Sequence, residues 1–233
     1  MIEAASLFGT ILIYMLSKRL YRRKPLLLLS PLITTPAALV ILLVTTGTPF
    51  GSYNAGAHWL SDMLGPATVA FAVPLSKHFD LIKKHAAEIL ASVLAGSAAA
   101  VASSFWMAEA LHLNKQLIYS LLPHSVTTPI AMNVSETIGG IPTITAVAVM
   151  MTGIFGSVAG PAVIRLCNIR GDIARGILLG TSSHGAGTSK AFEFSSVSGT
   201  VSSISMILAA VVTLAITPWI LAPLHLFLSG GPG

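Results

Sequence analysis

The densest group of reactive side chains in the sequence lies in residues 180–193, which read GTSSHGAGTSKAFE. The stretch holds three glycines, five hydroxyls, one imidazole, one amine and one carboxylate. Hydroxyls can hydrogen-bond a small hydroxy acid, and the imidazole of His184 can exchange a proton near neutral pH. Glycines that interrupt a helix leave backbone N–H groups free at the positive end of a helix dipole, where anions bind. Together these residue types indicate a binding site for a small anion.

The composition of the whole chain indicates that this stretch lies in a membrane. Of the 233 residues, 54% are hydrophobic and 9% are charged, whereas about 25% are charged in ordinary globular domains. Several apolar stretches approach the roughly 20 residues that cross a bilayer. At that depth a polar helix break is tolerated only where protein buries it or it lines a wet cavity. We therefore expect one integral membrane domain over residues 1–233.

The basic residues predict how the chain is oriented in the membrane. Eleven of the thirteen Lys and Arg residues fall in three clusters, and the positive-inside rule places all three in the cytoplasm. The clusters are Lys18, Arg19, Arg22, Arg23 and Lys24, then Lys77, Lys83 and Lys84, then Arg165, Arg170 and Arg175. They adjoin apolar spans and hold no series of aromatic residues on which bases could stack, so we expect no nucleic acid as a partner despite the net charge of +5.

The order of apolar segments between these clusters predicts the crossings. The expected membrane segments are 4–16, 26–46, 59–75, 86–108, 141–163, 175–194 and 201–228, with an external loop at 47–58. Segment 141–163 must run inward to reach the third cluster, so residues 116–140 must begin and end on one side. We expect a re-entrant element there, with Pro123 and Pro129 in it. The alternative is that one weaker segment is not a full crossing.

The segments also predict an internal repeat. Residues 26–108 and 141–228 each hold three segments, and the two sets of three cross the membrane in opposite directions. The first set has a break at 64–68 and the second at 180–187. Paired discontinuous helices in inverted repeats mark the binding site of many secondary transporters. The predicted fold class is an all-α polytopic membrane protein, an inverted repeat of transmembrane helices with discontinuous helices near the midplane.

Polar residues in or beside these breaks are the candidate ligands of a substrate. They are Thr68, His124, Ser125, Thr127, Thr128, Asn133, Ser182, Ser183, His184, Thr188, Lys190 and Glu193. Each hydroxyl could instead bond only its own backbone, as Ser and Thr often do in membrane helices. Lys190 and Glu193, spaced i, i+3, could be a structural ion pair. His184 is the first candidate for proton coupling and His124 the second.

Other chemistries find little support in the sequence. It holds no HExxH motif or cysteine cluster for a metal and no GxSxG nucleophile elbow. The stretch at 180–190 fails the spacing of a phosphate-binding GxxxxGK[ST] loop. We expect no enzyme activity and no cofactor or metal; an intramembrane hydrolase that uses a serine and His184 is the remote enzyme alternative.

Three stretches resemble signature sequences of one family. LLPHSVTTPIAMNVSETIGGIPTITAV, GILLGTSSHGAGTSKAFE and LGPATVAFAVPL resemble the LrgB/CidB family of bacterial membrane proteins, over nearly the whole chain. That family commonly has a lysine at the position of His124. The resemblance implies a multi-pass protein of the bacterial inner membrane, described as antiholin-like and modulating murein hydrolase activity and autolysis. It also implies a small LrgA/CidA-type membrane partner. Plastid relatives resemble a glycolate/glycerate translocator, and bacterial relatives are linked to pyruvate.

Two functions of different classes follow. The first is a proton-coupled secondary transporter of small monocarboxylates of the glycolate, glycerate or pyruvate class. The alternative is an antiholin-like regulator that acts with a holin-like partner and has no transport cycle. The sequence favours transport, because a regulator of that kind needs no polar break at midplane depth. The expected partners are the carboxylate, the lipid bilayer, the LrgA/CidA-type protein and a second copy of the chain in a homodimer.

Overall fold

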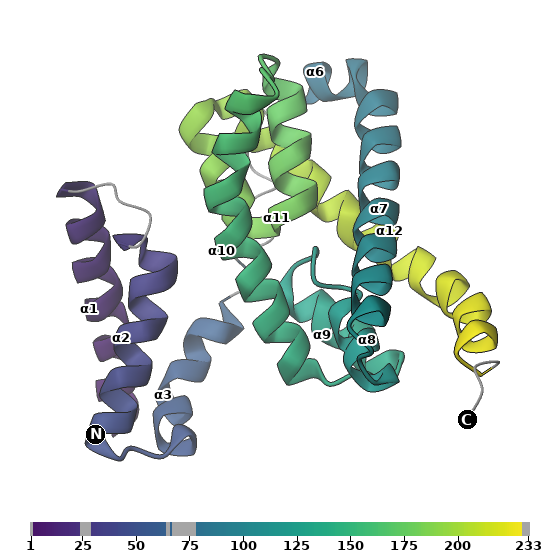
Figure 1. Cartoon of the computed structure of the whole chain (residues 1–233). Helices are drawn as coiled ribbons and strands as arrows, with labels where there is room; N and C mark the ends of the chain where they lie inside the picture. The colour runs from purple at the N-terminus through teal and green to yellow at the C-terminus, as the bar shows by residue number, and fades with distance from the viewer. Residues whose placement is uncertain (1, 24–28, 64–65, 67–77, 230–233) are drawn as a thin grey trace. The chain divides into compact units, whose positions relative to one another are not determined.

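The computed structural model describes residues 2–23, 29–63, 66 and 78–229, and within them every regular element is an α-helix (Figure 1). Among these described residues, three helices are long and apolar enough to cross a membrane: α7 (Ala86–Ala110), α10 (Pro142–Leu166) and α12 (Ser196–Ser229), the last over Ser196–Ile216. The predicted all-α membrane class is therefore confirmed. The chain forms two compact units, Met1–Ala70 and Phe71–Gly233.

The first unit contains α1 (Ile2–Arg23), α2 (Pro31–Thr46) and α3 (Phe50–Asp62). Helix α3 corrects the predicted external loop at 47–58. Gly47 ends α2 in the left-handed conformation, and Pro49 then starts the new helix at its N-cap. Gly56 is buried and lies against the backbone of Glu3, so it serves close packing of α3 on α1.

Three sequence predictions lie at least partly outside the described residues. Thr68 and the predicted break at 64–68 fall there apart from Pro66, as does most of segment 59–75. The inverted repeat of 26–108 with 141–228 depends on that break and stays a prediction.

In the second unit a helical hairpin occupies residues 116–140, where the sequence predicts a re-entrant element. Helices α8 (Lys115–Leu121) and α9 (Thr128–Thr137) are its two arms, and we call residues 115–137 hairpin 1. The chain returns to α8 just after α9, because the Ile141 N–H donates to Ser120 Oγ at 2.7 Å. Phe105 and Ala108, near the end of α7, pack with Ile118 of α8. The outer ends of both arms of hairpin 1 therefore lie near the C-terminal end of α7 (Figure 1).

Helix α11 (Asp172–Phe194) is not the single crossing that the sequence predicted for 175–194. Ser183 and His184 have non-helical dihedral angles and divide it into two halves, and we call it hairpin 2. The second half returns along the first, because the Arg175 guanidinium lies 5.6 Å from the centre of the Phe194 ring. Gly187 packs against the Leu179 carbonyl oxygen, which in a continuous helix would lie two turns away. The break falls within the predicted 180–187, but the chain turns back there.

This return reverses the predicted direction of the last segment, 201–228. Helix α12 begins beside the start of hairpin 2, where Ser198 Oγ donates to the Asp172 carbonyl oxygen at 3.0 Å. It also begins beside α6 (Phe79–Lys84), because His78 Nε2 lies 3.1 Å from Ser196 Oγ. The basic residues of α6 and of the α10–α11 connection thus share one end of the unit. By the positive-inside rule α12 leaves the cytoplasmic end and runs outward, not inward.

The described part of the second unit therefore contains the short helix α6, two helix–hairpin pairs and a final helix. Helix α7 runs outward and is followed by hairpin 1, whereas α10 runs inward and is followed by hairpin 2 (Figure 1). The two pairs run in opposite directions, as the halves of an inverted repeat do. Their boundaries differ from those of the repeat that the sequence predicts.

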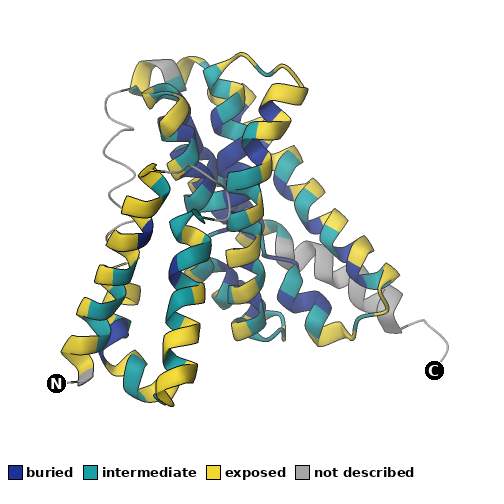
Figure 2. Ribbon diagram, turned by 60° about the vertical axis from the view of Figure 1, so that its left-hand side comes forward, coloured by how far each residue is buried: buried dark blue, intermediate teal, exposed yellow. Residues whose placement is uncertain are grey.

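The core of this unit lies where the hairpins meet the long helices. Val126 and Ala131 at the inner end of hairpin 1 pack with Val149 of α10 and Ala210 of α12. Large apolar side chains such as Val211 are exposed, as lipid-facing positions are, and Figure 2 shows exposed residues along the outer faces of the helices. The inner ends of both hairpins are thus held at the middle of α10, away from either end of the bundle.

Candidate functional site

The turn of hairpin 2 is built around His184. Its φ of 41° and ψ of −132° lie in a region that non-glycine residues rarely adopt, and such backbone strain persists only where the surroundings impose it. The ring is fixed on α10, since Nε2 donates to the Val149 carbonyl oxygen at 2.9 Å. Gly153, one turn further along α10, makes the space: a Cβ there would lie 2.8 Å from Cε1 of the ring.

Ser182 and Ser183 form the other side of the same turn. Ser182 Oγ donates to the Leu178 carbonyl oxygen at 2.7 Å and lies 2.9 Å from Ser183 Oγ. Because the Ser182 proton is used in the first bond, Ser183 is the donor in the second. Ser183 is fully buried, and its Oγ packs against Gly156 of α10. Both serines line a pocket of about 500 Å³ between α10 and hairpin 2, with Met151, Thr152, Phe155, Gly156, Ala159, Gly160, Val163 and Leu178.

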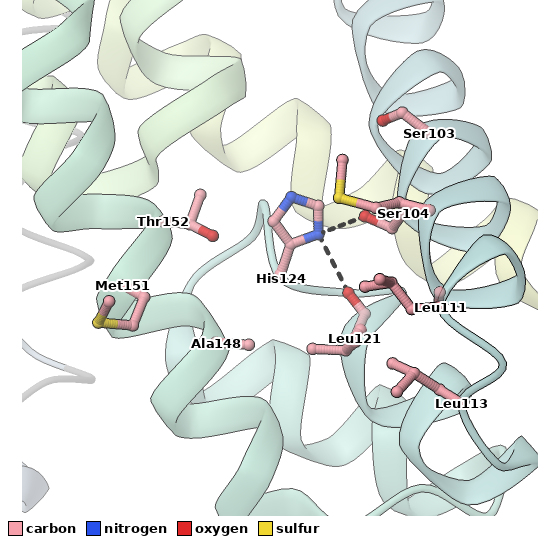
Figure 3. A pocket seen from close by; sticks show the side chains of 11 residues that line it. Ser103, Ser104, Leu111, Leu113, Leu121, His124, Ala148, Met151 and Thr152 are labelled. Carbon is pink, nitrogen blue, oxygen red and sulfur yellow. Dashed lines mark hydrogen bonds between the residues drawn. The ribbon is translucent and has the colours of Figure 1, made fainter.

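The turn of hairpin 1 presents His124 to a second pocket. His124 Nδ1 lies 3.0 Å from the Leu121 carbonyl oxygen and 3.0 Å from Ser104 Oγ on α7 (Figure 3). The carbonyl can only accept, so Nδ1 carries the proton of the neutral ring and Nε2 is left as an acceptor. Among the described residues Nε2 has no hydrogen-bond partner. This pocket, of about 370 Å³, is lined by Ser103, Ser104, Met107, Ala108, Leu111, Leu113, Leu121, His124, Ala148, Met151 and Thr152.

The two pockets adjoin at one place on α10. Met151 and Thr152 line both of them. The first pocket extends from there toward Leu111, just past the outer end of α7, and the other toward Val163, near the cytoplasmic end of α10. Each hairpin turn therefore borders one pocket, His124 the first and Ser182 and Ser183 the second, and we call the part around Met151 and Thr152 the central region.

Two helix N-termini contribute to this central region. Helix α9 starts at the turn of hairpin 1, and the second half of α11 starts at the turn of hairpin 2. The first N–H groups of each have no partner within the helix, and the positive ends of both dipoles lie at the turns. Since Lys190, the nearest cation in hairpin 2, is paired with Glu193, the backbone supplies the positive potential here.

Several predicted site residues are gathered at the turn of hairpin 1. Ser125 is buried, and its Oγ has no hydrogen-bond partner within the described part of the chain. Thr127 is the N-cap of α9 but its side chain makes no capping bond, and Thr128 follows as the first helical residue; both are half-buried. The Ser125 hydroxyl is thus a buried polar group without a protein partner in the described residues, and none of these three residues lines either pocket.

Other predicted residues lie away from the two turns. Asn133 is exposed on α9. Thr188 is buried between hairpin 2 and α12, where its hydroxyl lies 3.0 Å from Ser202 Oγ. Lys190 and Glu193 pair with each other near the returning end of hairpin 2, with Glu193 exposed. The structure thus places His124, Ser125, Thr127, Thr128, Ser182, Ser183 and His184 at the turns, and these four elsewhere.

Sequence reasoning missed Ser104 and Thr152, which line the pockets from α7 and α10. Each lies inside a long, mainly apolar helix that holds other Ser or Thr residues as well. The available signal was that Gly153, Gly156 and Gly160 follow Thr152 along α10, a run of small residues that allows close approach by another element.

Comparison with known proteins assigns the chain. The model of the LrgB-like family matches residues 10–222, which include both hairpins. The chain belongs to the LrgB-like family. It is 57% identical to YwbG of Bacillus subtilis over 221 residues, covering 95% of this chain and 98% of YwbG. It is 39% identical to YxaC of the same organism, covering 87% of this chain and 88% of YxaC.

The holin-like protein CidB of Staphylococcus aureus is a further relative, 34% identical over 209 residues, which cover 90% of this chain and 91% of that protein. CidB of Staphylococcus epidermidis is similar to the same extent. No solved structure matches the chain significantly. The family and its membrane character are therefore shown, as the resemblance in the signature stretches predicted.

Proposed function

We propose that this LrgB-like protein is a secondary transporter of small monocarboxylates of the glycolate, glycerate or pyruvate class. The observation that carries the proposal is the meeting of the two pockets at Met151 and Thr152, between the turns of the hairpins. Alternating access requires a site that can be reached from either side of the membrane, but from one side at a time, and discontinuous helices near the midplane are the usual place for it.

The chemistry of the central region supports an anion of this size. A carboxylate can accept bonds from the first N–H groups of α9 and of the second half of α11. The hydroxyls of Ser125 and Thr127 can add charge-assisted hydrogen bonds. A 2-hydroxyl group on the substrate can donate to Nε2 of His124, which supports a hydroxy acid as the substrate.

His124 is also the group that best supports proton coupling. Its Nε2 faces no protein partner, whereas Nε2 of His184 is bound to the Val149 carbonyl oxygen. A proton on Nε2 of His124 would turn that atom into a donor for the arriving carboxylate. Binding of the proton and of the carboxylate would then favour each other by the same free energy.

Uptake of labelled glycolate, glycerate and pyruvate into proteoliposomes of the purified chain tests the proposal. We expect saturable uptake of at least one of the three, driven by an inwardly directed proton gradient. Replacement of Thr152 by Val keeps the volume and removes the hydroxyl that both pockets share, so it should reduce uptake. Absence of uptake above empty liposomes for all three acids would refute transport.

The names of the relatives support the second candidate function more directly. Two of them are called holin-like protein CidB, and that name favours an antiholin-like regulator of murein hydrolase activity and autolysis over transport of any particular carboxylate. Under this proposal the chain acts in the bacterial inner membrane with a small LrgA/CidA-type protein, and as a homodimer. Autolysis measured in cells that express the Thr152→Val variant separates the two functions, because a regulator without a transport cycle keeps its effect.

A further inference from the structure

The beginning of α12 carries an unusual number of buried hydroxyls. Residues 196–206 read SVSGTVSSISM, and Ser198, Thr200, Ser202, Ser203 and Ser205 are each at most 1% exposed. They face hairpin 2 and α7 inside the second unit. A buried hydroxyl requires a hydrogen-bond partner, and one without a partner calls for an explanation such as a bound ion or water.

Most of these hydroxyls have a partner. Ser203 Oγ donates to the Gly199 carbonyl oxygen at 2.9 Å, and Thr200 Oγ1 donates to the Ser196 carbonyl oxygen at 2.8 Å. Ser202 Oγ lies 3.0 Å from Thr188 Oγ1. Ser205 is the exception on this face, because its Oγ has no hydrogen-bond partner in the described part of the chain.

Two more hydroxyls without a partner come from the elements opposite Ser205. Ser97 of α7 is 2% exposed and Thr181 of hairpin 2 is 7% exposed, and neither has a hydrogen-bond partner among the residues described. Thr181 lies against α7, since a Cβ on Gly96 would be 2.9 Å from its Cγ2. Gly180, just before Thr181, packs on the backbone of Ser202. Thr181 is thus placed between α7 and α12.

Thr181 connects the surroundings of Ser97 and Ser205. Helices α7 and α12 both start at the cytoplasmic end, and α12 crosses α7 obliquely (Figure 1). Ser97 follows Gly96, which lies against Thr181, and Ser205 lies about one helical turn after Ser202, which lies against Gly180. The three elements therefore present three buried hydroxyls to one layer, which we call the hydroxyl layer: Ser97, Thr181 and Ser205.

The break in hairpin 2 adds carbonyl oxygens to the hydroxyl layer. The first half of α11 ends at Ser182, so the carbonyl groups of its last turn, which includes Thr181, lack the usual helical donors. This half-helix end carries the negative end of the dipole. Neutral hydroxyl and carbonyl oxygens without a carboxylate suit a hard monovalent cation, whereas divalent cations are usually held with carboxylates. We propose that the hydroxyl layer binds Na⁺.

This inference goes beyond the proposed function and does not rest on it, because it concerns binding by the protein alone. The test is thermal unfolding of the purified chain in detergent, in NaCl, KCl or choline chloride at equal ionic strength. A ligand that binds only the folded state raises Tm as its concentration exceeds Kd. We expect Tm to rise with the logarithm of the Na⁺ concentration, and not in choline. Equilibrium dialysis with ²²Na⁺ gives the Kd directly.

Two variants and a matched control connect this response to the hydroxyl layer. Ser205→Ala and Thr181→Val each remove one oxygen, and each should weaken Na⁺ binding at least about tenfold, or about 1.4 kcal/mol. Both should remain folded without Na⁺, because removing a hydroxyl that has no partner is close to neutral for stability. Ser203→Ala is the control: Ser203 is equally buried on the same helix but bonded to the Gly199 carbonyl oxygen, so the variant should bind Na⁺ like the wild type.

Two results would overturn the proposal. One is an equal rise of Tm in all three salts together with no ²²Na⁺ bound. The other is unchanged Na⁺ affinity in both Ser205→Ala and Thr181→Val, which would assign these hydroxyls to buried water.

Discussion

Replacing Gly153 by Ala tests whether α10 fixes the turn of hairpin 2. The added Cβ would lie 2.8 Å from Cε1 and 3.0 Å from Nε2 of His184, so the ring has to move. Moving it removes the 2.9 Å bond from Nε2 to the Val149 carbonyl oxygen. A hydrogen bond contributes about 0.5–1.5 kcal/mol net, and overpacking costs about 1–3 kcal/mol. Together these costs are about 1.5–4.5 kcal/mol, and the higher helix propensity of alanine offsets about 1 kcal/mol, so we expect a net loss of about 2 kcal/mol in the free energy of unfolding.

Thermal unfolding in detergent measures this loss. For a chain of about this size, 1 kcal/mol corresponds to about 2–4 °C, so Tm should fall by at least about 4 °C. The transport rate in proteoliposomes should fall as well, because the turn of hairpin 2 borders the central region. Gly9→Ala in α1 is the matched control: a Cβ there meets nothing within 4 Å, and alanine favours a helix over glycine. A Gly153→Ala protein with the Tm and uptake of the wild type would refute the placement of His184 on α10.

Three other predictions concern the pH dependence, the topology and the ligands. His124→Gln cannot carry a proton, so uptake that rises toward mildly acid pH in the wild type should become flat between about pH 5 and 8; an unchanged pH profile would contradict a role of His124 in coupling. Single cysteines that replace Val197 and Gly171 should both be labelled from the cytoplasmic side, because hairpin 2 returns the chain to that side. Labelling of the cysteine at position 197 from outside would show that residues 175–194 cross the membrane once. Ser125→Ala and Thr127→Ala should raise the KM for uptake about tenfold or less while Tm stays near the wild type, because neither hydroxyl holds the fold; a collapse of Tm in both would show that they are structural.

The sequence predicted hairpin 1 but not hairpin 2, for a physical reason. The charge clusters required residues 116–140 to start and end on one side, so a re-entrant path was the simplest solution. Residues 175–194 have the length of one crossing, and hydropathy alone does not distinguish one crossing from two half-helices that fold back. The distinction lies in packing: Gly187 lets the returning half approach the Leu179 carbonyl oxygen. Such a contact depends on three-dimensional register.

The candidate site was predictable where the backbone is irregular and unpredictable where it is regular. Ser125, Thr127 and Ser183 stand next to prolines or glycines, and those neighbours identified the turns. Ser104 and Thr152 stand within regular helices, where a hydroxyl more often bonds only its own backbone. That they line a pocket with His124 follows only from the three-dimensional arrangement, in which α7 and α10 lie on either side of that residue.

The meeting of the two pockets at Thr152 also determines where the membrane voltage acts. Water-filled access from both sides would leave only the hairpin turns and the middle of α10 as insulating material. Most of the transmembrane potential would then fall across that thin layer, although the bilayer core is about 30 Å thick. A bare carboxylate that passes the layer exchanges about 2.3 kcal/mol with the field per 100 mV, over a movement of a few side chains. A carboxylate that crosses together with one proton carries no net charge, and the voltage does no work on it.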